Sequence, residues 1–167
     1  LLSGGTGRGS HTEEVPSFLP DRFEPGTPNI PGILGLHAAL CDLEQTDMGK
    51  LHQHELELTQ YFINGLMQMD PSESTLRAIG KHNTIERTSV VSVQTLQTDM
   101  ARVAYEMDDT YGIMTRVGLH CAPSAHKTLG TYPEGTIRFS FGPENTHHEV
   151  DLALHALAEI TGSPYHL

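Results

Sequence analysis

The side chains best suited to chemistry surround Cys121. A short apolar run over residues 112–117 predicts a strand, after which the chain turns, places His120 beside Cys121, and is stopped from continuing by Pro123. A thiol at the tip of such a turn can reach into a cleft. Positive neighbours, including Arg116, favour the thiolate, which is the nucleophilic form of cysteine. Taken from the residues alone, a nucleophile and a structural loop cysteine are equally supported.

Arg138 is the second candidate, and it lies inside another strand-like run over residues 136–141. A guanidinium held on a strand could bind a carboxylate in a bidentate manner. Its neighbours Ile137 and Phe139 should face the opposite side of the strand. If those two face the core, Arg138 faces a cleft or solvent, and periodicity does not separate these alternatives.

Other residues that could bind ligands give weaker patterns. The glycine-rich residues 3–10 could expose backbone N–H groups to a phosphate, but no Lys follows them, and a flexible loop is the alternative. His52 and His54 are two apart, so on a helix they diverge, and no Cys-x-x-Cys or His-Glu-x-x-His pattern exists. We therefore expect no metal site. Cys41 lies on an apolar helical face and is expected to be buried.

These residues must be positioned by alternating helices and strands. The periodicity of apolar residues predicts a helix after Asn29 and a longer one over residues 47–69, each with an apolar stripe that reads as core. Strands interleaved with helices then predict an α+β domain, in which a small sheet is covered on one face. The expected later elements are strands at 75–79 and 89–93, a helix at 98–107, and a last helix that Asn145-Thr146 opens.

Composition and charge narrow the possible functions. The chain has 167 residues, enough for a substantial core, and a net charge of -11, which disfavours nucleic acid as a partner because phosphate binding needs a positive face. No stretch approaches the roughly 20 apolar residues of a membrane span, and no signal peptide is visible. The two cysteines are far apart and make no disulfide framework, so we expect a reducing cytoplasm.

Several motifs together resemble one family, the class V aminotransferases, and in particular the C-terminal part of their cysteine desulfurase and selenocysteine lyase branch. Their order and spacing extend over nearly the whole chain. The matching motifs are Gly4-Gly5-Thr6-Gly7, residues 22–29, Arg116-x-Gly-x-His-Cys-Ala122, Arg138-x-Ser140 and Asn145-Thr-x-x-Glu-Val-Asp151.

The resemblance implies a fold and a domain organisation. The chain should contain the C-terminal small domain of a pyridoxal phosphate-dependent transferase of fold type I, with a mostly antiparallel sheet covered by helices. It implies that residues 1–45 are the tail of the large cofactor-binding domain. Residues 46–71 would form the linking helix, and residues 72–167 the small domain.

The resemblance also implies an activity for the whole enzyme. Cysteine would be converted to alanine, and the Cys121 thiolate would take the sulfur as a persulfide. Arg138 would hold the substrate's α-carboxylate, with Arg116 and His120 at the same substrate site, supporting the cysteine loop electrostatically. The short loop resembles that of enzymes that pass sulfur to a separate acceptor protein.

The cofactor of such enzymes is pyridoxal 5'-phosphate, bound to a lysine upstream of the cysteine. His126-Lys127 lies downstream of the cysteine and lacks the family's context, so the cofactor lysine is expected to be missing and this chain alone to be inactive. Gly5, Thr6 and Gly7 match the segment that reaches the cofactor phosphate of the neighbouring subunit. The resemblance therefore implies a homodimer.

Two alternatives stay open. One is a class V aminotransferase or lyase of the same fold in which Cys121 carries no persulfide. The other is an interaction module without cofactor. Pro143-Glu144 departs from the family, which usually has an aromatic residue just before Asn-Thr.

Overall fold

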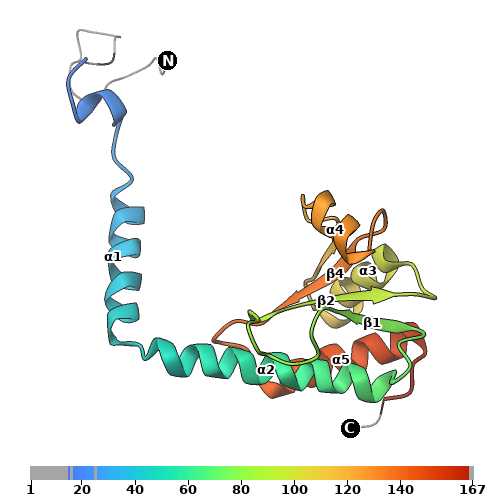
Figure 1. The fold of residues 1–167 in the computed structure, drawn as a ribbon. Helices are drawn as coiled ribbons and strands as arrows, with labels where there is room; N and C mark the ends of the chain where they lie inside the picture. The colour runs from blue at the N-terminus through green and yellow to red at the C-terminus, as the bar shows by residue number, and fades with distance from the viewer. Residues whose placement is uncertain (1–14, 16, 25, 166–167) are drawn as a thin grey trace. The chain divides into compact units, whose positions relative to one another are not determined.

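The structure of the protein is a computed structural model that describes residue 15, residues 17–24 and residues 26–165 (Figure 1). The chain divides into two compact units, Leu1–Asp47 and Met48–Leu167. The described part of the first unit holds a short 3-10 helix η1 (Asp21–Phe23) and helix α1 (Ile30–Gln45).

Helix α1 begins where the sequence predicts a helix, but it buries none of its side chains. The Asn29 side chain accepts a hydrogen bond from the Gly32 N–H at 3.1 Å and so caps the first turn. Cys41 is half-exposed, so the prediction of a buried Cys41 is wrong: no described element of this unit covers the helix. The exposed apolar side chains of α1 include Ile33, Leu34, Leu36, Leu40 and Leu43.

The second unit is α+β and contains a four-stranded sheet with the order β1-β2-β4-β3. All three pairings are antiparallel, which confirms the predicted fold class. Its elements are α2 (Met48–Met69), β1 (Leu76–Ile79), β2 (Val90–Thr95), α3 (Met100–Tyr111), β3 (Arg116–Gly118), α4 (Pro123–Leu129), β4 (Thr136–Ser140) and α5 (His147–Thr161).

Helices α2 and α3 each pack against α5, and the three form the core with one face of the sheet, while α4 lies beyond the other face (Figure 1). Phe62 of α2 is fully buried, with its ring centroid 4.8 Å from that of Phe139 and 5.3 Å from that of Phe141. Val91 and Val93 of β2 are fully buried as well. Their alternation with polar residues leaves the opposite sheet face free to carry the candidate site.

The carboxylate of Asp70 joins the end of α2 to the first strand. It accepts hydrogen bonds from the N–H groups of Thr75 at 2.6 Å and Leu76 at 3.0 Å, and from the Ser72 hydroxyl at 2.8 Å. Burial opposes its ionisation, but these hydrogen bonds outweigh burial and lower the pKa of Asp70 to about 2.

Two boundaries near the candidate site differ from the sequence prediction. Helix α3 continues to Tyr111, and Gly112 caps it with a left-handed φ of 66°, so the strand begins only at Arg116. Pro123 does not stop the chain but opens α4, because proline has no N–H to lose in a first helical turn.

The last helix starts as the sequence predicts. Thr146 and Glu149 form a capping box: the Thr146 hydroxyl accepts from the Glu149 N–H, and the Glu149 carboxylate accepts from the Thr146 N–H at 2.8 Å. Asn145 accepts from the Gly142 N–H at 2.8 Å and fixes the approach from β4.

Candidate active site at the Cys121 turn

Cys121 lies exposed on a tight turn that follows β3. The turn is closed by a hydrogen bond of 2.8 Å from the Ala122 N–H to the Leu119 carbonyl. Between them His120 and Cys121 both take left-handed backbone conformations, with φ of 50° and 59°. Two successive non-glycine residues in this region cost about 1–2 kcal/mol each, so neighbouring contacts must hold the turn.

Arg138 lies on the sheet face opposite the core. Ile137 and Phe139 are buried in the core, which confirms the predicted alternation around Arg138. Across the ladder Arg138 is paired directly with Arg116 of β3, and like charges in this position repel. The Nε atom of Arg138 is buried without a hydrogen-bond partner among the described residues. An anion bound at this face would satisfy that donor and screen the repulsion.

His120 connects the arginine pair to the cysteine turn. Its Nε2 atom lies 3.1 Å from the Thr136 hydroxyl, and its Nδ1 atom is buried without a partner among the described residues. Burial first, and then the charges of Arg138 and His126, lower the pKa of His120. The lowered pKa favours the neutral imidazole of His120, whose contact with the Thr136 hydroxyl joins the turn to β4.

A buried histidine lies next to His120, and the sequence patterns did not identify it as a site residue. His126 of α4 is only 5% exposed, and its Nδ1 atom lies 2.7 Å from the hydroxyl of fully buried Thr131. Its ring centroid is 5.7 Å from that of His120, with the ring planes at 46°. In the sequence, only Gly130 hints at this contact. It ends α4 in a left-handed conformation, after which the chain turns back so that Thr131 meets His126.

The start of β4 approaches the end of β3 too closely for a side chain. Gly135 has a φ of 83°, and a Cβ atom there would lie 2.2 Å from the Gly118 carbonyl oxygen. This contact brings Thr136 to its position opposite Gly118, from which it reaches His120.

The other predicted site residues, Gly5, Thr6 and Gly7, fall outside the described residues. Lys127 and Lys81, which were not predicted as site residues, interact with other side chains. The Lys127 ammonium lies 5.1 Å from the centre of the Tyr132 ring, and Lys81 pairs with Glu86 at 2.9 Å. The structure thus pairs Arg116 with Arg138 and links His120, the residue before Cys121, to the same strand through Thr136.

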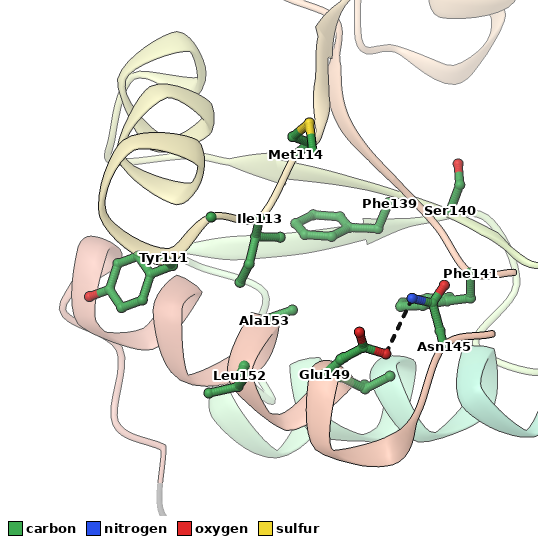
Figure 2. Close-up of a pocket in the computed structure, with 12 residues that line it drawn as sticks. Tyr111, Ile113, Met114, Phe139, Ser140, Phe141, Asn145, Glu149, Leu152 and Ala153 are labelled. Atoms are coloured by element: carbon green, nitrogen blue, oxygen red, sulfur yellow. Dashed lines mark hydrogen bonds between the residues drawn. The ribbon is translucent and has the colours of Figure 1, made fainter.

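Two cavities flank the sheet. One, of about 440 Å³, is lined in part by Ser92, which is paired with Arg138 and so lies on the same sheet face. The other, of about 330 Å³, lies between the end of α3, β4 and the start of α5, and includes Met114 and Phe139 (Figure 2). No predicted site residue that the structure describes lines either of these two cavities.

The described part of the chain holds no group of three or more His, Cys, Asp or Glu residues placed to bind a metal ion. None of its helices has the length and the apolar composition that crossing a membrane requires.

Comparison with known proteins yields a consistent group. The family model for aminotransferase class-V matches residues 2–153. A probable cysteine desulfurase of Pyrococcus abyssi is 34% identical over 144 residues, covering 86% of this chain and 34% of that protein. One of Methanothermobacter thermautotrophicus is 31% identical over 164 residues, covering 97% of this chain and 40% of that protein.

Solved structures that resemble this chain include cysteine desulfurases as well. The apo structure of a cysteine desulfurase from Thermococcus onnurineus superposes with a TM-score of 0.72 at 34% identity, covering 86% of this chain and 34% of that one. The cysteine desulfurase CsdA of Escherichia coli, in an S-sulfonic acid form, gives a TM-score of 0.63 at 26% identity, with coverages of 84% and 32%. The chain spans about a third of the length of the curated relatives it matches.

Proposed function

Because the chain belongs to the aminotransferase class-V family, we propose that the complete protein containing it is a pyridoxal phosphate-dependent cysteine desulfurase. The observation that carries the proposal is the arrangement around β3 and β4. The exposed thiol of Cys121 lies on a turn, and His120, the residue before it, contacts Thr136 on the strand that carries Arg138. Removal of sulfur from an amino acid requires a sulfur nucleophile and a group that binds the substrate carboxylate, and Cys121 and Arg138 would supply these.

Arg138 binds the substrate's α-carboxylate. Its buried Nε atom has no hydrogen-bond partner among the described residues, and a carboxylate accepts two parallel N–H bonds from a guanidinium. Arg116, directly opposite, adds a second positive charge, so the site selects an anionic group. The adjoining cavity beside Ser92 gives this face of the sheet room for a ligand.

Cys121 accepts the sulfur. Its thiolate attacks the sulfur atom of the substrate cysteine, forming a sulfur–sulfur bond as the carbon–sulfur bond breaks. The electron pair of the broken bond stays on the carbon fragment, which takes up a proton and leaves as alanine. Pyridoxal phosphate, when bound, supplies the electron sink that makes this cleavage possible. The exposure of Cys121 then allows an acceptor protein to remove the sulfur.

We assign the cofactor lysine to the part of the complete protein outside this chain. Among the described residues, Lys81 and Lys127 already interact with Glu86 and Tyr132. Residues 1–45 would belong to the large domain, with Thr6 contacting the cofactor phosphate of a second subunit in a homodimer. The predicted setting is the cytoplasm, where a free catalytic thiol stays reduced.

The test uses the complete protein with L-cysteine and measures alanine. Cys121→Ala should abolish alanine formation, whereas Cys41→Ala, the matched control, should leave it unchanged. Equal alanine formation by Cys121→Ala would support instead an aminotransferase or lyase without a persulfide. A complete protein that neither binds pyridoxal phosphate nor consumes cysteine would favour the interaction module.

A further inference from the structure

His126 is a buried titratable residue that the proposed reaction does not use. It is 5% exposed and lies in α4, the seven-residue helix that follows the cysteine turn. A buried imidazole without a polar partner would be costly, and Thr131 provides one at 2.7 Å. Thr131 is fully buried and also approaches the His126 carbonyl with its hydroxyl at 3.4 Å. The contacts of Thr131 with the His126 ring and with the His126 carbonyl therefore fix the position of the ring.

From this ring a chain of contacts leads to the cysteine. The His126 ring lies 5.7 Å from the His120 ring, and His120 is held on its other side by the Thr136 hydroxyl at 3.1 Å. His120 is the first of the two left-handed residues, and Cys121 is the second. Because this conformation is unfavourable for both, the turn keeps its shape only while its neighbours constrain it.

We propose that His126 is a positioning residue for Cys121: held by Thr131, it packs against His120 and maintains the strained turn that presents the thiol. The role in catalysis rests on the proposed function, whereas the role in maintaining the turn does not. His126 touches neither substrate nor thiol in this assignment, and acts through His120.

The chain offers matched variants for a test. An asparagine amide occupies the place of the histidine Nδ1 atom and can donate to or accept from Thr131, whereas a glutamine amide extends to the place of Nε2. His126→Asn should therefore keep the bond to Thr131, and His126→Gln should lose it. Thr131→Val removes the same bond from the other side while keeping the side-chain shape, and Thr131→Ser keeps it.

The first readout is amide hydrogen exchange of the complete protein, followed by mass spectrometry of the peptide that spans residues 118–126. The Ala122 N–H closes the turn, so exchange reports the turn directly. We expect exchange about tenfold faster in His126→Gln and Thr131→Val, and near wild type in His126→Asn and Thr131→Ser. A peptide covering β1 and β2 should be unchanged in all four variants.

The second readout is the rate of alanine formation. In His126→Gln and Thr131→Val we expect kcat to fall about tenfold with KM within about twofold, because Arg138 still binds substrate while the thiol is misplaced. Unchanged exchange in both variants, or equal effects of Asn and Gln, would overturn the positioning role. If the wild-type protein forms no alanine, the proposed function fails, and the exchange measurement still decides the role of His126.

Discussion

Asp70 provides a quantitative test of how the second unit is stabilised. Its side chain is 7% exposed and accepts hydrogen bonds at the junction between α2 and β1. Its pKa falls from an ordinary value of 3.8 to about 2. At about 1.4 kcal/mol per pKa unit, the ionised carboxylate stabilises the folded state by about 2 kcal/mol at neutral pH.

The pH dependence of this stabilisation has a defined sign. Because the pKa of Asp70 is lower in the folded than in the unfolded state, its contribution is complete above pH 5 and is lost as the pH falls towards about 2. By the same relation, about 1 kcal/mol of it is lost between pH 5 and pH 3.

The assay is urea unfolding of the chain at pH 5 and pH 3 for wild type and Asp70→Asn. The variant should be less stable by about 2 kcal/mol at pH 5, and the difference should shrink by about 1 kcal/mol at pH 3. Asp109→Asn, at an exposed position in α3, is the control and should change stability by less than about 0.5 kcal/mol. A difference between wild type and Asp70→Asn that is the same at both pH values would contradict the lowered pKa of Asp70 in the folded state.

Three further predictions concern other parts of the molecule. Gly135→Ala should lower the free energy of unfolding by more than about 2 kcal/mol in urea, against about 1 kcal/mol for Gly130→Ala, since only the first adds a backbone clash to a left-handed φ; equal losses would contradict this. In the native chain, iodoacetamide should label Cys121 faster than Cys41, and it should label both cysteines without denaturant. Complete protection of Cys41 would show that this side chain is buried after all. The exposed apolar side chains of α1 should make the chain self-associate in sedimentation velocity, and Leu36→Glu should weaken this association; a monomeric wild-type chain would count against it.

Sequence patterns correctly predicted those helix starts and strand faces that depend on residues close together in the chain. The capping residues Thr146 and Glu149 start α5 where the sequence indicates, because the box closes within one turn. The alternation around Arg138 correctly separated its buried neighbours from the face that carries the guanidinium. Gly112 and Pro123 are each compatible with more than one local structure. In this fold Gly112 caps α3 instead of starting a strand, and Pro123 begins α4 instead of ending an element.

The contacts that support the site depend on tertiary structure and leave little trace in the sequence. Thr131 meets His126 only because α4 ends at Gly130 and the chain turns back. The environment of Cys41 could not be predicted from its apolar helical stripe, because such a stripe does not show whether another element covers it.

In the proposed function, Cys121 receives sulfur from cysteine. The direct measurement is mass spectrometry of peptides from the complete protein after incubation with L-cysteine in the absence of a sulfur acceptor and reductant. We expect the peptide containing Cys121 to gain the mass of one sulfur atom and the peptide containing Cys41 to stay unmodified. Alanine formation with an unmodified Cys121 peptide, or the added sulfur on Cys41, would contradict it.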